Sequence, residues 1–410
     1  MRKKYFGSMV LLLAASFGSS SAMELKQFGW LAGFYNQGLA NTQMSGSKSQ
    51  SSYAGLQSRI GVNWNMGYGW SSGAAVVAAL PVMQSSKAYS KSYYTDSGDF
   101  SDLYVRYANE GFKFALGRFM SDEFIASDWI AGPLQGGAIR YTNSFFDVWG
   151  TVMDSKLGLG KQLGRYGSEL SWLKAYNPTI KEKSMGGEVL SGGFGFKKWG
   201  FSIDPYIFYN TNVVLANGLY GNKGLLQAGF NGSYAYSNNS LKAITTLKFM
   251  FQNTEARNVA LGIHGGLPYN DSINAKSNKD NTFFVLIEEE LRYQAFKAGV
   301  GYYQIDSGAG IWSVNDKMRF YGKYVNGIGT SNYLARGAYS GYVFLGYDAD
   351  RIKIDFLYAG GSYNEISLAT MYRAYKGKDS ALDIGGAYVN SGGSISKNSN
   401  ALVLFSKLSF

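Results

Sequence analysis

The sequence predicts an all-β protein, a transmembrane antiparallel β-barrel. Two observations carry this prediction. Segments of about ten residues with apolar side chains at every second position recur along the chain. The composition is also rich in glycine (53), tyrosine (32) and phenylalanine (26), with only 5 prolines. Membrane-spanning strands are apolar only on their lipid side, so they give this pattern without any long apolar run.

Residues 1–22 have the pattern of a secretory signal peptide. Basic residues at positions 2–4 precede an apolar run at 10–15, and Ser20 and Ala22 are the small residues of a cleavage site. The apolar run is too short to span a bilayer as an anchor helix. We therefore expect an exported chain, in which residues 23–410 form a single outer-membrane barrel.

Charge and composition exclude several function classes. The net charge is +11, of which three charges lie in the signal peptide, leaving +8 on the mature chain. The basic residues form no run or helical stripe, so we expect no nucleic-acid partner. Cysteine is absent and His264 is the one histidine, which argues against thiol, zinc and Ser/His/Asp chemistry. We expect no enzyme and no cofactor; calcium among the loop carboxylates is open but not predicted.

The alternation of apolar and polar residues defines the strands. In 54–64, Leu56 and Ile60 alternate with small or polar residues, and 241–252 and 351–360 repeat the pattern. The predicted strands are 27–37, 53–64, 70–81, 99–109, 112–119, 136–143, 145–154, 188–198, 200–210, 223–236, 241–252, 282–293, 295–305, 337–347, 351–359, 364–375, 380–390 and 401–410.

These segments predict eighteen strands. Both chain ends should lie on one side of the membrane, which requires an even number, and sixteen or twenty strands are the alternatives. The extended stretches 167–177 and 316–325 would both span the membrane in a twenty-stranded barrel; we assign both to long external loops. Tight turns such as 65–69, 197–200 and 237–240 alternate with long polar loops, which predicts short periplasmic turns and long external loops.

The last ten residues suggest how the barrel closes. Leu402, Leu404, Leu408 and Phe410 share one side of an extended strand, with Ser406 as the exception. This strand should pair with the first one, because an open edge would leave backbone groups unpaired in hydrocarbon. The stretch resembles the end of bacterial outer-membrane porins, which the barrel-insertion machinery recognises. The resemblance implies that Leu404, Leu408 and Phe410 are this signal, and that the outer membrane of a Gram-negative bacterium, with its lipid and lipopolysaccharide, surrounds the barrel.

Residues 114–150 resemble part of the OprD-like channels and the related major porins of campylobacter-type bacteria. The likeness covers about a tenth of the chain and rests on Gly117, Arg118, Pro133, Gly136 and Gly137. It implies a water-filled channel for passive diffusion of small hydrophilic or charged solutes and ions, including carboxylate-bearing nutrients. Porin resemblance also implies a homotrimer.

The wall of such a barrel cannot fill its own lumen, so water should fill it. We expect the third external loop, 120–135, to fold inward and present Asp122, Glu123 and Asp128 to the wall; an ordinary solvated loop is the alternative. A charge facing lipid would cost about 2–4 kcal/mol at the bilayer midplane, so the other charged strand residues should face water. They are Arg59, Asp102, Arg106, Arg118, Arg140, Lys242, Lys248, Glu288, Glu290, Arg292, Lys297, Lys353, Asp355 and Arg373. Because both signs occur, we expect weak charge selectivity.

Two other functions remain open. One is a hydrophobic-solute channel of the fatty-acid type, with fourteen strands and an N-terminal hatch. The predicted first strand begins within a few residues of the mature start, which leaves little room for a hatch. The other is an adhesin or surface-interaction barrel, with loops 85–99 and 253–281 as contact surfaces.

Overall fold

The computed structural model describes residues 24–39, 43–44, 47–48, 52–84, 97–130, 132–158, 181–212, 224–238, 240–254, 281–313, 316, 318–322, 333–395 and 398–410. The predicted signal peptide, the stretch 167–177, His264 and most of the two proposed contact loops lie outside these residues.

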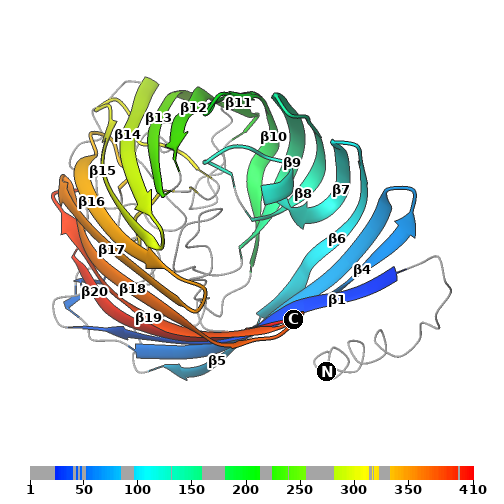
Figure 1. Cartoon of the computed structure of the whole chain (residues 1–410), viewed down its shortest axis with the longest axis horizontal. Coiled ribbons are helices and arrows are strands. Elements are labelled where there is room, and N and C mark those ends of the chain that lie inside the picture. The colour runs from blue at the N-terminus through cyan, green and yellow to red at the C-terminus, as the bar shows by residue number, and fades with distance from the viewer. Residues whose placement is uncertain are drawn as a thin grey trace.

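The chain forms a closed antiparallel barrel of 18 strands (Figure 1). The strands are β1 (Glu24–Gly38), β4 (Ser52–Gly67), β5 (Trp70–Gln84), β6 (Ser97–Asn109), β7 (Phe112–Met120), β8 (Pro133–Thr142), β9 (Phe146–Gly158), β10 (Lys181–Lys198), β11 (Phe201–Asn210), β12 (Leu225–Ser237), β13 (Leu241–Thr254), β14 (Asn281–Tyr293), β15 (Phe296–Ile305), β16 (Tyr339–Asp348), β17 (Ile352–Gly361), β18 (Tyr363–Lys376), β19 (Ala381–Gly393) and β20 (Ser399–Ser409). Each long strand pairs with its neighbours in chain order, and β1 pairs with β4 and β20.

The remaining elements are short. β2 (Gln43–Met44) and β3 (Ser47–Lys48) form a separate small hairpin, and η1 (Ser121–Glu123) is a single 3-10 turn. No helix in the described ranges is long and apolar enough to cross a membrane.

All eighteen predicted strands are present, with ends that differ by a few residues. Sixteen and twenty strands are therefore wrong. The described part of 316–325 contains no strand, as predicted, but its residues 318–322 are buried, whereas we had assigned them to an external loop.

The wall has an apolar outside and a mixed inside. Along β16, Val343 and Leu345 are exposed, whereas the alternating Tyr342 and Phe344 are buried. The same alternation on the other strands exposes a large set of leucine, valine, isoleucine and aromatic side chains. Such an apolar belt suits a bilayer, because soluble monomers rarely expose large apolar patches.

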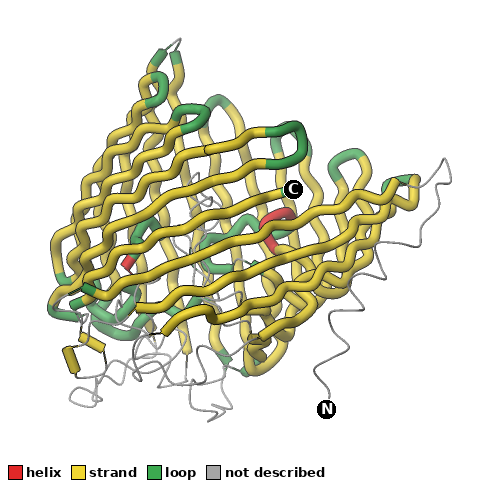
Figure 2. Tube along the Cα trace, turned by 90° about the horizontal axis from the view of Figure 1, so that it is seen from below, coloured by secondary structure: helices red, strands yellow, loops and turns green. Residues whose placement is uncertain are grey.

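The two rims of the barrel differ. At one rim, called here the turn rim, three connections consist of a non-glycine residue and a glycine, both with positive φ: Tyr68 and Gly69, Glu110 and Gly111, and Trp199 and Gly200. This geometry is that of type I′ turns, whose twist matches that of the flanking strands. The other rim, called the loop rim, carries the longer connections (Figure 2).

The barrel closes between β1 and β20. Nine residues of β1 pair with β20, from Trp30 with Ser409 to Gly38 with Ala401. Gly29 and Phe410 then exchange two backbone hydrogen bonds, of 2.8 and 3.0 Å. The chain end is thus part of the closing ladder.

Gly29 should be intolerant of a side chain. A Cβ there would lie 2.3 Å from the carbonyl oxygen of Arg59 and 3.1 Å from the ring of Phe410. We expect Gly29→Ala to lower the unfolding free energy by about 1–3 kcal/mol through overpacking. Gly341→Ala is the matched control, because a Cβ at Gly341 meets no atom within 4 Å.

The measurement is the denaturant concentration at which half of the refolded barrel is unfolded. The folded fraction is monitored by its heat-modifiable migration on a gel. Equal midpoints for the two variants would contradict the tight closure at Gly29.

Candidate functional site: charges and inward loops in the lumen

The connection between β7 and β8, residues 121–132, packs against the inner wall; we call it the inward loop. Phe124, Ile125 and Ile130 are at most 2% exposed. Trp129 donates its indole N–H to the hydroxyl of Tyr206 on β11 and packs edge-on against Phe284 on β14. Since side chains of the wall alone would leave this space to water, the loop narrows the lumen.

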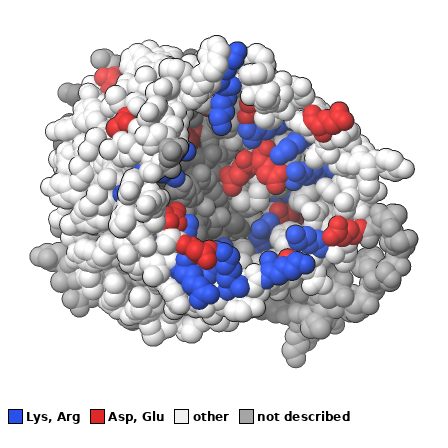
Figure 3. Space-filling view, in the orientation of Figure 1, with Lys and Arg blue, Asp and Glu red and all other residues white. Residues whose placement is uncertain are grey.

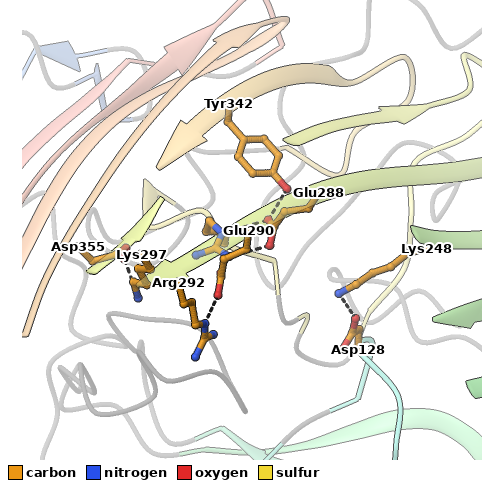
Figure 4. Close-up of polar contacts among 9 residues, drawn as sticks. Asp128, Lys248, Glu288, Glu290, Arg292, Lys297, Tyr342 and Asp355 are labelled. Carbon is orange, nitrogen blue, oxygen red and sulfur yellow. Dashed lines mark hydrogen bonds and ion pairs between the residues drawn. The ribbon is translucent and has the colours of Figure 1, made fainter. Parts of the chain in front are cut away.

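The acidic residues of the inward loop contact basic residues of the wall. A Glu123 carboxylate oxygen lies 2.6 Å from a guanidinium nitrogen of Arg106 on β6. Asp128 forms an ion pair with Lys248 on β13 (Figure 4). The side chain of Asp122 is exposed. Two of the three predicted loop carboxylates thus meet cations that the sequence also placed in the lumen.

The described parts of a second connection, between β15 and β16, also enter the lumen; we call these residues, 306–313, 316, 318–322 and 333–338, the long inner loop. Gln252 and Thr282 donate to the backbone carbonyls of Gly310 and Ala309, at 2.9 and 2.7 Å. Gln227 donates to the carbonyl of Trp312 at 2.6 Å. Side chains of β12, β13 and β14 therefore hold the first part of this loop against the wall.

Arg319 is the central contact of the long inner loop. Its guanidinium bonds Glu288 at 2.7 and 3.1 Å and Glu290 at 3.1 Å, and its Cζ lies 3.5 Å from the ring centroid of Phe344. Figure 4 shows both carboxylates, with Tyr342 donating to Glu288 at 2.7 Å. Burial lowers the pKa of Arg319, but the Glu288 carboxylate raises it more, so the pKa lies above its ordinary value and the group stays charged.

The end of this segment is held by a buried carboxylate. Glu365 on β18 is 2% exposed and accepts the backbone N–H groups of Tyr321 and Gly322 at 2.8 and 2.9 Å. Ser367 and Tyr363 donate to the same carboxylate. Tyr321 also donates its hydroxyl to Asp355 on β17 at 2.7 Å; burial and this carboxylate raise the pKa of Tyr321, which keeps the hydroxyl as a donor.

The inward position of the long inner loop was not predicted from the sequence. Its signal was present, since residues 309–312 and 318–321 are largely apolar within an otherwise polar connection. Apolar residues in a loop point to packing, but only the fold shows that they pack inside the barrel.

The wall carries paired charges of both signs, and Figure 3 shows them side by side around the lumen. The pairs on the inner face are Arg59 with Asp102, Arg140 with Asp147, Arg292 with Glu290, Lys297 with Asp355, Lys353 with Asp348, and Arg373 with Asp383. The predicted lumen residues are therefore mostly neutralised by neighbours.

The two partners of a pair are not equally exposed. The exposed fractions of the cationic and acidic side chains are 17% and 3% for Arg59 with Asp102, 32% and 9% for Arg292 with Glu290, and 26% and 9% for Arg373 with Asp383. The inward loop reverses this order, with 24% for Arg106 and 50% for Glu123. Lys353 and Asp348 differ little, at 23% and 30%. Three wall pairs thus present cations to water, whereas the inward loop presents carboxylates.

Arg118 corrects one prediction. It was expected in the lumen, but it shares the outer face of β7 with Leu116 and pairs across the ladder with the exposed Leu103. The alternation along β7 explains this, because Arg118 has the parity of the exposed Leu116, whereas Phe119 has the parity of the buried Ala115 and packs inside against Phe124. Asp99 neutralises it at 3.3 Å.

Lys242, another predicted lumen residue, is the second residue of β13 and lies beside the turn rim, where its side chain is exposed. Among the described residues, no three His, Asp or Glu side chains are grouped closely enough to hold a metal ion.

The inward loop should control the width of the lumen through Trp129. Trp129→Ala removes its packing on Phe284 and its bond to Tyr206, a loss of about 3–5 kcal/mol for a buried tryptophan. We expect larger and noisier single-channel current steps in a planar bilayer. Trp199→Ala is the control, because this turn-rim tryptophan is 81% exposed. Equal conductance for the wild type and Trp129→Ala would contradict this role.

Comparison with known proteins identifies the fold. No family model and no curated protein sequence matches this chain. The chain is similar to the crystal structures of OccAB1 from Acinetobacter baumannii (TM-score 0.64, 9% identity, 94% of this chain and 96% of that one) and OpdK from Pseudomonas aeruginosa (0.62, 9%, 94% and 98%). OccD3 of P. aeruginosa is similar too (0.62, 11%, 96% and 93%). The protein, with its 18 strands, therefore shares its fold with these structures of OprD-like outer-membrane porins.

Proposed function

We propose that the protein is an outer-membrane porin, a water-filled channel for passive diffusion of small hydrophilic solutes and ions, with a weak preference for anionic solutes. The observation that carries the preference is the unequal exposure within the wall pairs. Arg59, Arg292 and Arg373 each cover the carboxylate that neutralises them. At these three pairs a passing solute therefore meets the guanidinium group before it meets the carboxylate.

The preference should be weak because every one of these cations has an acidic partner. Lumen charges select ions through their summed field, which pairing reduces at a distance. The exposed Glu123 of the inward loop adds a negative group to the same lumen. Exposed cations on the wall and carboxylates on a loop also give a field across the channel, which would orient dipolar solutes.

A carboxylate-bearing nutrient is the solute class that fits best. A guanidinium binds a carboxylate through two parallel hydrogen bonds, and three wall arginines are partly accessible. A crystal structure of OpdK with vanillate has a TM-score of 0.64 to this chain at 7% identity. Vanillate is a carboxylate, and this supports the same class here.

The proposal also covers the export of the chain, its insertion into the outer membrane, its constriction and its assembly. Residues 1–22 would direct export and be removed, and 23–410 would insert into the outer membrane of a Gram-negative bacterium, among lipid and lipopolysaccharide. The insertion machinery would read Leu404, Leu408 and Phe410, whose side chains lie on the outer face. Residues 120–135 would form the constriction, and three copies would assemble as a homotrimer.

The two alternative functions lack support. A fourteen-stranded hydrophobic-solute channel does not agree with 18 strands. Adhesion through the loops 85–99 and 253–281 draws on residues that lie largely outside the described part of the chain, and no observation favours it.

The proposal predicts the electrical behaviour of the refolded mature protein. In a planar bilayer we expect steady, ohmic single-channel steps, because an open lumen conducts without gating. Under a KCl gradient the reversal potential should favour chloride slightly, and an added aromatic carboxylate should reduce the current.

Heat-modifiable migration on a gel confirms that the barrel is folded before the recording. A folded barrel that passes no current would contradict the porin proposal. A reversal potential that clearly favours potassium would retain the porin but overturn its anion preference.

A further inference from the structure

We propose that Arg319, a residue of the long inner loop, sets the ion preference of the channel by neutralising, together with Arg292, two carboxylates of the wall. The inference rests on the proposed function, since it concerns ions that cross the lumen. The loop, and not the strand that carries the carboxylates, would then decide the charge that solutes meet beside β14.

The two carboxylates are neighbours on one face. Glu288 and Glu290 are two residues apart on β14, so their side chains point to the same side, about 7 Å apart along the strand. They are 9% and 6% exposed. Rings and clusters of carboxylates are the groups with which cation channels select their ions. Uncovered, this pair would attract potassium.

The guanidinium group of Arg319 contacts both carboxylates. One of its terminal nitrogens contacts Glu288 and Glu290, and its Nε bonds Glu288 a second time. The planar fork of a guanidinium makes such contacts, whereas an ammonium acts as a point charge. The Phe344 ring beneath the guanidinium fixes its plane.

Two other cations of β14 and β15 lie near these carboxylates, and each forms an ion pair. Lys297 lies 3.1 Å from Asp355 and is buried with it. Arg292 contacts Glu290 (Figure 4). Glu288, Glu290, Arg292 and Arg319 together carry no net charge, and loss of Arg319 would leave this group with one negative charge.

The loop has anchors that do not depend on Arg319. The backbone N–H groups of Tyr321 and Gly322 are held by Glu365, and the hydroxyl of Tyr321 by Asp355. A substitution at Arg319 therefore changes the charge at β14 while these contacts keep the next residues in place.

The experiment compares reversal potentials under a KCl gradient for four variants of the full mature chain. Arg319→Met removes the charge, and Arg319→Lys keeps it. The double variant Arg319→Met, Glu288→Gln removes one charge of each sign and leaves Glu290 with Arg292. Lys378→Met removes one positive charge from an exposed position on the turn between β18 and β19, as the matched control.

We expect Arg319→Met to raise the potassium-to-chloride permeability ratio roughly two- to tenfold, the effect of one uncompensated charge at short range in a partly screened medium. Arg319→Lys should shift it much less. The double variant should return close to the wild-type ratio, because the group is again neutral, and Lys378→Met should match the wild type. The return in the double variant separates a charge effect from a displaced loop, which the added glutamine would not correct.

The outcomes that overturn the proposal are distinct from failure of the porin itself. If the wild type conducts and Arg319→Met has an unchanged ratio, Arg319 does not set the preference, while the porin stands. If Arg319→Met does not fold, the double variant Glu288→Gln, Glu290→Gln replaces it. This variant removes both negative charges that face Arg319 and should shift the permeability ratio toward chloride. No shift would overturn the proposed role of Arg319. A wild type that passes no current removes both proposals.

Discussion

The structure depends on one constraint, the need of every backbone N–H and C=O group in hydrocarbon for a partner. A sheet satisfies this only when it has no edge, so the first and last strands must meet. Here they do so through nine residue pairs and the exchange between Gly29 and Phe410. Once the wall is closed, its eighteen strands fix a lumen that the wall side chains alone do not fill.

The interior is then organised by the two loops that enter it. The inward loop contributes apolar anchors and carboxylates, and the long inner loop contributes apolar anchors and the guanidinium of Arg319. Each loop is held by packing and by hydrogen bonds to inner side chains, Tyr206 for the inward loop and Gln252 for the long inner loop. The charges that solutes meet therefore belong partly to the wall and partly to the loops.

The fold could be predicted from the sequence because a barrel strand has a local signature. The period of two defined every long strand, and it placed Arg59 and Glu288 on the inner face, where each has a partner. Partners could not be predicted, because Arg319 and Glu288 are 31 residues apart and meet only when a loop folds back. Arg118 was wrong because its charge was given more weight than the period of two, which places it on the same side of β7 as Leu116.

The apolar packing beneath the loops has an electrical consequence. Phe284 and Tyr363 of the wall, with Phe320 and Tyr333 of the long inner loop, form a buried aromatic layer inside the barrel. Such a layer is a medium of low dielectric constant, and field lines from a charge at its surface are directed into the adjoining water. A guanidinium backed by this layer would act on a passing ion from farther away than the same group on a fully hydrated surface.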